Sequence, residues 1–191
     1  MTALLLSPGS CGALHMADGF DLRPAMDSDA AIIARWMAEP QIRRWWRQDW
    51  SVERWTQQIA EQSAGEHSLP CVVSLHGEDL GYVELYRVRH DRIADYYDHD
   101  VHDWGVHVAI GSGRTGQGIG RRLLAAVADA LLQADPRCRR VVAEPDATNE
   151  PSVRAFGAAG FVAVAELQLP EKKALLMVRS RTSSDMEGLS R

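Results

Sequence analysis

The sequence lacks the features that mark several classes of protein. Its three cysteines, Cys11, Cys71 and Cys138, form no CxxC pair, so neither a disulfide framework nor a zinc site is expected. No run approaches the ~20 apolar residues of a membrane helix, and the first residues lack the basic segment of a secretory signal. The formal net charge of -5 argues against a nucleic-acid partner. These absences predict a cytoplasmic protein with reduced thiols, no metal and no membrane partner.

The periodic segments predict one mixed α/β domain. Strands are expected at 20–24, 69–75, 82–88, 104–110, 140–144, 161–169 and 173–180, and helices at 28–39, 51–62, 118–134 and 151–159. The helix at 118–134 has the clearest apolar face. We therefore expect a single domain at 20–181, a flexible extension at 1–19 and a disordered tail at 182–191.

A glycine-rich segment links the 104–110 strand to the 118–134 helix. Gly116, Gly118 and Gly120 carry no Cβ, so backbone N–H groups there can face an anion, and the helix start adds unpaired donors. Arg121 and Arg122 stand in the first turn, where the helix dipole disfavours cations. Basic side chains fit that position when an anion is bound, so the segment predicts a phosphate-binding loop.

Two common phosphate loops do not fit this segment. The letters Gly111-x-Gly113-x-x-Gly116 match a dinucleotide fingerprint, but the helix begins later and no strand ending in an acidic residue follows. A P-loop is excluded because no Gly-Lys-Ser/Thr closes the turn. A pyrophosphate cradle of the Gly-x-Gly-x-Gly type remains.

This loop, with the order of elements, resembles the GCN5-related N-acetyltransferases (GNAT). The resemblance implies a mostly antiparallel mixed sheet with helices on both faces and strands splayed around acyl-CoA, acetyl-CoA being the default donor. The residues it places on acyl-CoA are Val108, Ile110, Arg114, Gly116, Gln117, Gly118, Gly120, Arg121, Asn149 and Ser152. One departure is Phe156, which stands where the family often has a tyrosine that protonates the leaving thiolate.

A narrower resemblance is to the siderophore-pathway acyltransferases of that family. The segments that carry it are His67–Pro70, Gly81–Tyr86, Asp95–Asp98, Trp104–His107 and Glu144–Asn149. The resemblance implies that His107 and Asp146 form the catalytic pair. It also implies that the acceptor and acyl pocket is lined by Trp45, Trp46, Trp50, Glu84, Tyr86 and Tyr97.

The residues themselves give an independent indication for the pair. Along 104–110 the apolar Val106 and Val108 alternate with His107, which therefore points to the opposite face of the strand. Asp146 follows the C-terminal end of a strand, where α/β sheets bind ligands. If the two strands are adjacent and parallel, Asp146 would fix the tautomer of His107 and raise its basicity. The plainer interpretation is a core histidine and a turn aspartate.

The predicted reaction is acyl transfer to the side-chain amine or hydroxylamine of lysine or ornithine. A long-chain acyl group from an acyl carrier protein is the second donor considered, and Arg121, Arg122 and a cluster near Arg137 could dock such an acidic carrier or the phosphates of CoA. Two rival functions are an antibiotic-modifying acetyltransferase and a non-catalytic acyl-CoA-binding module. The protein is expected to be a monomer or homodimer.

Overall fold

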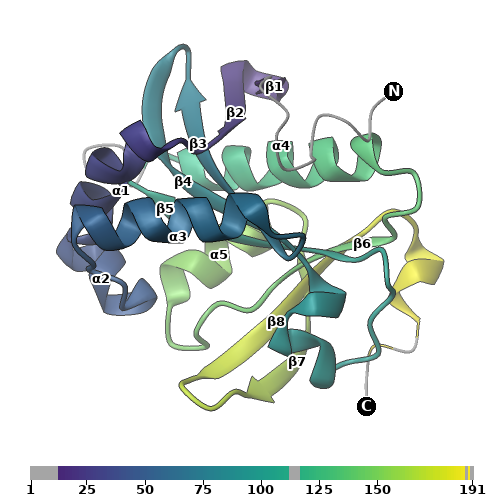
Figure 1. Cartoon of the computed structure of the whole chain (residues 1–191). Helices are drawn as coiled ribbons and strands as arrows, with labels where there is room; N and C mark the ends of the chain where they lie inside the picture. The colour runs from purple at the N-terminus through teal and green to yellow at the C-terminus, as the bar shows by residue number, and fades with distance from the viewer. Residues whose placement is uncertain (1–12, 112–116, 188, 190–191) are drawn as a thin grey trace. The chain divides into compact units, whose positions relative to one another are not determined.

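The computed structural model describes residues 13–111, 117–187 and 189 of the chain. Its strands are β1 (Leu14–His15), β2 (Phe20–Pro24), β3 (Ser68–Leu75), β4 (Glu78–Arg87), β5 (Trp104–Ile110), β6 (Arg140–Ala143), β7 (Val162–Gln168) and β8 (Lys173–Ser180). Its α-helices are α1 (Ala30–Met37), α2 (Pro40–Trp46), α3 (Val52–Ala64), α4 (Ile119–Ala134) and α5 (Glu150–Ala158), as labelled in Figure 1. The mixed α/β class expected from the sequence is confirmed.

The strands form a mixed sheet. Hydrogen-bonded neighbours follow the order β1-β2-β3-β4-β5-β6-β8-β7. The pairs β1–β2, β2–β3, β6–β8 and β7–β8 are antiparallel, whereas β5 and β6 are parallel. The adjacency and parallel direction of the 104–110 and 140–144 strands are thus confirmed. The chain divides into two compact units, Met1–Leu85 with His107–Ile119 and Tyr86–Val106 with Gly120–Arg191.

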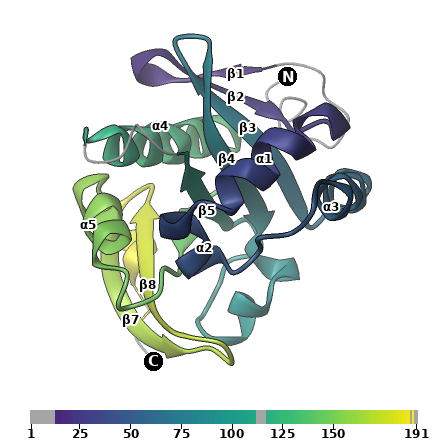
Figure 2. The same ribbon diagram turned by 90° about the vertical axis from the view of Figure 1, so that its left-hand side faces the viewer.

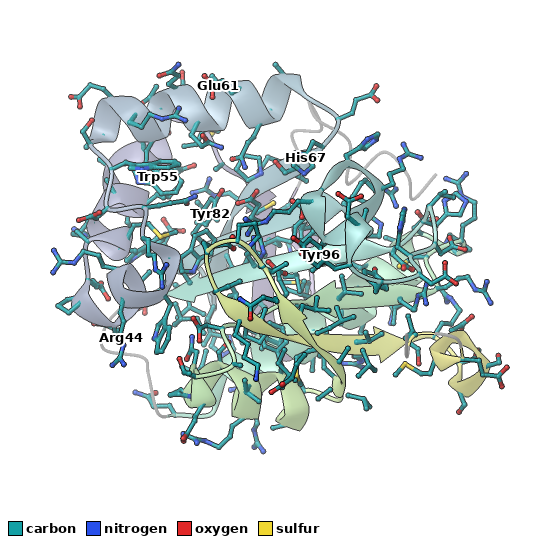
Figure 3. All side chains as sticks on the ribbon, turned by 90° about the horizontal axis from the view of Figure 1, so that it is seen from below. Arg44, Trp55, Glu61, His67, Tyr82 and Tyr96 are labelled. Carbon is teal, nitrogen blue, oxygen red and sulfur yellow. The ribbon has the colours of Figure 1, made fainter. Side chains whose placement is uncertain are left out.

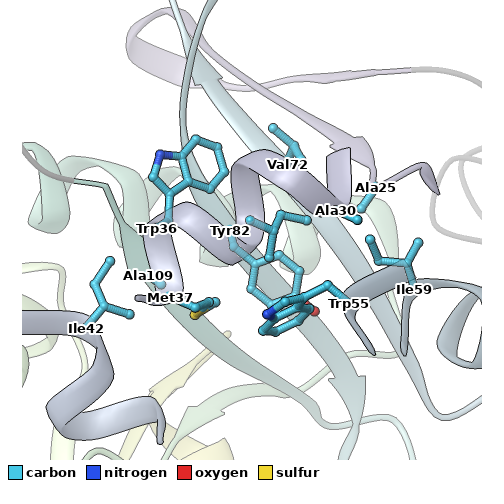
Figure 4. Packing of buried hydrophobic residues seen from close by; sticks show 11 residues of the cluster. Ala25, Ala30, Trp36, Met37, Ile42, Trp55, Ile59, Val72, Tyr82 and Ala109 are labelled. Carbon is cyan, nitrogen blue, oxygen red and sulfur yellow. The ribbon is translucent and has the colours of Figure 1, made fainter. Parts of the chain in front are cut away.

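The first unit buries its core between helices and the β3–β4 hairpin. Because α1 and α3 pack against each other and α3 against β3, one face of these strands is covered, as Figure 2 shows for α1 over β4. Figure 4 shows this core, in which the rings of Trp55 and Tyr82 are in contact. Its buried residues are Ala25, Ala30, Ile33, Trp36, Met37, Ile42, Trp55, Ile59, Val72, Tyr82 and Ala109. The hairpin turns at His76 and Gly77, whose positive φ of 52° and 82° suits a tight turn.

The second unit has a core of its own around β6, β7 and β8. Its members are Tyr86, Val88, Ile93, Tyr97, Val142, Leu167, Leu169, Ala174, Leu176, Val178 and Leu189. The expected apolar face of α4 is buried, with Leu123 and Leu131 at most 1% exposed. Phe156 is likewise buried on α5, with its ring 5.0 Å from that of Phe161.

Arg179 of β8 and Arg181, which directly follows β8, hydrogen-bond to backbone carbonyls at the ends of helices in the same unit. Arg181 donates through its guanidinium to the carbonyls of Leu132 and Asp135, at the end of α4. Arg179 donates to the carbonyl of Ala159, just past α5, at 2.9 Å. The last carbonyls of a helix have no partner within the helix, so these guanidiniums satisfy acceptors that would otherwise need water.

Three segments differ from the sequence expectation. Pro40 ends α1, but it also begins α2, a helix that we did not predict; it occupies the first turn, where the absent N–H costs nothing. Leu14 and His15, which we expected in a flexible extension, pair with β2. In the expected tail, Ser183–Met186 form a 3-10 turn and Leu189 is 3% exposed.

Candidate active site

In the first unit, His107 lies on β5 beside an aromatic ring of α2. Its imidazole meets the indole of Trp46 edge-on, with ring centroids 5.8 Å apart at 81°. His107 shares its strand face with Ala109, which is 3% exposed and belongs to the buried cluster. The alternation along this strand therefore places His107 on the face that α1, α2 and α3 cover. Its side chain is partly buried and not fully enclosed by the core.

Trp46 makes a second contact with the same strand. Its indole N–H donates to the backbone carbonyl of Val108 at 3.4 Å, while its ring lies 5.6 Å from that of Tyr82. One side chain at the end of α2 thus touches both the His107 ring and the carbonyl of Val108. Such a contact restrains the orientation of the imidazole and of the Val108 backbone together.

A chain of polar groups runs through the same unit beside the aromatic rings. The buried hydroxyl of Tyr82 donates to Oε1 of Gln62 at 3.3 Å, and Nε2 of Gln62 donates to Oε1 of Glu84 at 2.8 Å. Burial raises the pKa of Tyr82 well above its ordinary value, and the charge of Glu84 raises it further. The Gln62 amide therefore fixes the orientation of the Glu84 side chain. Gln62 was not predicted from the sequence, where nothing distinguishes it from other surface glutamines.

The other two tryptophans predicted to line the pocket, Trp45 and Trp50, also lie in this unit. Trp50 is partly buried, with its ring 5.1 Å from that of Trp55 and the guanidinium of Arg54 above it at 4.8 Å. Trp45 lies on α2, and the guanidinium of the exposed Arg44, which is labelled in Figure 3, is 4.7 Å from the centroid of its ring. Both rings are thus covered by arginine rather than closed in the core.

In the second unit, Asp146 follows β6 in a turn. Its Oδ1 accepts from the backbone N–H of Thr148 at 2.9 Å and from the Thr148 hydroxyl at 2.6 Å. Asp146 also forms an isolated bridge with Ala174. The turn role that we weighed for this aspartate is present, and the catalytic role remains a prediction.

Tyr86 and Tyr97, predicted to bind substrate, are buried in the second unit. Tyr86 is 1% exposed, and its hydroxyl donates to Oε2 of Glu144 at 2.8 Å. A Cβ on Gly105 would lie 2.0 Å from the Tyr86 ring, so only glycine leaves room for it. Tyr97 donates to Oδ2 of Asp103 at 3.1 Å. Their hydroxyls hold internal carboxylates. Gly105 and Glu144 stood inside the motifs that we quoted, but nothing in the sequence showed their packing role.

The predicted phosphate loop is described in part. Arg114 and Gly116 lie outside the described residues. Gln117 and Gly118 are exposed, and Gly118 has a φ of 71° that favours glycine. Gly120 and the exposed Arg121 follow in the first turn of α4. These positions suit an anion at the start of the helix.

The remaining predicted contacts of acyl-CoA lie on β5 and α5. Ile110 ends β5, partly buried. Asn149 caps α5, its side chain accepting from the backbone N–H of Ser152 at 3.3 Å. Asn149 thus has a capping role in the fold, and its contact with acyl-CoA stays a prediction.

The arginines near Arg137 are engaged by carboxylates of their own unit. Arg137 pairs with Asp135 at 3.5 Å, Arg139 with Asp185 at 2.7 Å and Arg140 with Asp103 at 2.9 Å. Arg140 is buried beside Asp103, whereas the other two are exposed. The described part of the chain holds no group of three His, Cys, Asp or Glu side chains suited to a metal ion. No helix within it has the length and apolar character of a membrane span.

Comparisons with known proteins agree with this architecture. The model of the Acetyltransferase (GNAT) domain family matches residues 25–169. Lysine N-acyltransferase MbtK of Mycobacterium sp. (strain MCS) is 37% identical over 172 residues, 89% of this chain and 70% of that protein. The N(6)-hydroxylysine O-acetyltransferase of Escherichia coli is 28% identical over 155 residues, 81% of this chain and 49% of that protein.

A solved structure shares the fold. An uncharacterized protein from Bacillus halodurans superposes with a TM-score of 0.82 at 28% identity, over 89% of this chain and 90% of that one. The mixed sheet, the glycine-rich entry to α4 and the family match, which covers most of the chain, lead to one conclusion. This protein belongs to the GNAT acetyltransferase family and is an acyl-CoA-dependent N-acyltransferase.

Proposed function

We propose that this protein transfers an acyl group from acyl-CoA to the side-chain nitrogen of lysine or a lysine derivative during siderophore biosynthesis. The observation that carries the proposal is the 37% identity to a lysine N-acyltransferase over 89% of the chain. The similarity to a hydroxylysine acetyltransferase supports the same class of acceptor. Acetyl-CoA is the donor proposed first, and carrier-borne long acyl chains are the second.

His107 is the proposed base and Asp146 the proposed carboxylate that orients it. As the neutral nitrogen attacks the thioester carbonyl, a C–N bond forms, the C–S bond breaks and a proton passes from nitrogen to His107. The backbone N–H of Val108 is the proposed donor to the developing oxyanion, and the contact of Trp46 with the Val108 carbonyl supports it by restraining that strand. Removal of a general base of this kind costs about 10²–10⁴ in rate.

The described cysteines do not offer a covalent route. Cys71 and Cys138 are both buried. Burial raises the pKa of Cys138 to about 12, and burial also raises that of Cys71. A thiol in such surroundings stays protonated and is a poor nucleophile, which favours direct attack of the acceptor nitrogen. Phe156 offers no proton to the leaving thiolate, so solvent or His107 is the proposed source.

The test measures free thiol release from acetyl-CoA and from a long-chain acyl-CoA, with lysine, ornithine and their N-hydroxy forms as acceptors. His107→Ala is compared with His90→Ala, which changes an exposed histidine. We expect acceptor-dependent release that falls at least 100-fold in His107→Ala alone. Coenzyme A binding without turnover on any acceptor would refute the proposal and favour a binding module.

A further inference from the structure

The register between β4 and β5 places a second ionisable side chain opposite His107. The backbone N–H of Gly111 donates to the carbonyl of Leu80 at 2.9 Å. A Cβ on Gly81 would meet the carbonyl oxygen of Ala109 at 2.1 Å and Cα of Ile110 at 3.0 Å, so Gly81 lies across from Ile110. Both observations give the same antiparallel register, in which each step forward along β4 is matched by one step backward along β5. Counting along the ladder in this unit, Glu84 faces His107.

The two side chains also share one face of the sheet. Tyr82 is two residues from Glu84 along β4, and Ala109 is two residues from His107 along β5. Both Tyr82 and Ala109 belong to the buried cluster under the helices. Side chains alternate with a period of two, so Glu84 and His107 point to that same face. Cβ atoms of facing residues lie about 4.5–5.5 Å apart. A carboxylate and the proposed base are therefore neighbours on one wall of the first unit.

The Glu84 side chain is held in a fixed orientation at this place. Gln62 donates to its Oε1 at 2.8 Å, and the Tyr82 hydroxyl, bonded to the other end of the Gln62 amide, fixes which way that amide points. The Glu84 side chain is only partly buried, so a ligand can approach it. The feature combines charge, orientation and access beside His107.

We infer that Glu84 binds the acceptor as an ammonium ion and makes the site selective for a free amine over its N-hydroxy form; this rests on the proposed function. The ordinary pKa of a lysine amine is about 10.4, so at neutral pH lysine arrives as a cation. A hydroxylamine is far less basic and arrives neutral. A fixed carboxylate attracts the lysine ammonium by its charge and has no such attraction for the neutral hydroxylamine. The ammonium first loses one proton through His107 to solvent. As the C–N bond forms and the C–S bond breaks, the second proton passes from nitrogen through His107 to the departing thiolate, which leaves as the thiol.

The experiment compares Glu84→Gln with the wild-type protein on lysine and on N6-hydroxylysine, with acetyl-CoA as donor. We expect KM for lysine to rise about tenfold or more with a smaller change in kcat, because a charge-assisted contact is lost. The kcat/KM for N6-hydroxylysine should change less than threefold. Glu84→Asp, which keeps the charge, should recover part of the preference for lysine. Glu78→Gln is the matched control, an exposed carboxylate on the same strand.

The results that would overturn the inference differ from the result that would refute the proposed function. An equal loss on both acceptors, with an unchanged melting temperature, would show that Glu84 acts on His107 and not on acceptor charge, and would overturn the inference. An unchanged ratio of the two kcat/KM values would also overturn it. Wild-type protein inactive on both acceptors and on ornithine would instead refute the proposed function, and the inference with it.

Discussion

Replacement of Gly105 by alanine tests whether the Tyr86 ring is locked against β5. The new Cβ would stand 2.0 Å from Cζ and 2.1 Å from Cε2 of Tyr86. Carbon atoms in contact prefer about 3.5–4.0 Å, so the ring must withdraw by roughly 1.5 Å. That movement takes the hydroxyl away from Glu144, to which it now donates at 2.8 Å. One methyl group therefore disturbs both the packing and a buried hydrogen bond.

The expected loss of stability follows from these two effects. Forcing an extra methyl group into a packed core costs about 1–3 kcal/mol, and a lost hydrogen bond to a carboxylate about 1.5–3 kcal/mol. Gly105→Ala should therefore lower the free energy of unfolding by about 2.5–6 kcal/mol. At about 2–4 °C per kcal/mol for a chain of this size, the melting temperature should fall by about 5–24 °C.

Urea unfolding of Gly105→Ala, Tyr86→Phe and the double variant measures the two parts separately. In the Tyr86→Phe background the hydroxyl is already gone, so Gly105→Ala should cost less by the hydrogen-bond part. Gly157→Ala is the control: it lies in α5 with no atom within 4 Å of the new Cβ, and should stabilise by about 0.5–1 kcal/mol. A cost below about 1 kcal/mol for Gly105→Ala, or an equal cost in both backgrounds, would refute the reasoning.

Two further predictions concern the first unit. Trp46→Phe keeps an aromatic ring beside His107 but removes the N–H that donates to the Val108 carbonyl. Steady-state kinetics should show kcat about three- to tenfold lower, with the control His90→Ala, at an exposed position, unchanged; an equal effect in both variants would contradict the contact. Burial alone would raise the pKa of Asp29, but hydrogen bonds from Arg23 and the Met26 N–H outweigh it and lower that pKa below 3.8. Its stabilisation is therefore present at neutral pH and lost as pH falls through the folded pKa. Asp29→Asn should cost about 1–3 kcal/mol in urea unfolding at pH 7 and progressively less under acid; a cost that does not vary with pH would argue against the ion pair.

Most of the fold was predictable because each element has a strong local signal. The alternation in 104–110 gave β5 with its observed bounds, and the apolar face of 119–132 gave α4. The α2 helix was missed because Pro40 both ends one helix and starts the next, and because α2 ends at Arg47 with a positive φ of 55°. An arginine gives no sequence signal for that conformation, which glycine or asparagine would have given.

For the candidate residues, the sequence predicts strand faces but not contacts, and their roles stay predictions. Period-two alternation placed His107 on the correct face of β5, since facing depends only on the strand itself. The contact of Trp46 with His107 depends on the unpredicted α2, and the position of Glu84 opposite His107 depends on a register that alternation cannot supply. Tyr86 and Tyr97 were predicted to line a pocket because aromatic residues in family motifs suit that role, whereas their hydroxyls hold the internal carboxylates Glu144 and Asp103.

Arg179 in β8 and Arg181 directly after it affect the order in which the second unit can be completed. The last carbonyls of α4 and the carbonyl just past α5 receive hydrogen bonds from Arg181 and Arg179, yet β8 follows α4 by nearly 40 residues along the chain. During synthesis both helices therefore emerge before the strand that satisfies their ends. Their final turns should fray until β8 docks between β6 and β7, which couples the completion of two helices to a single late step of sheet assembly.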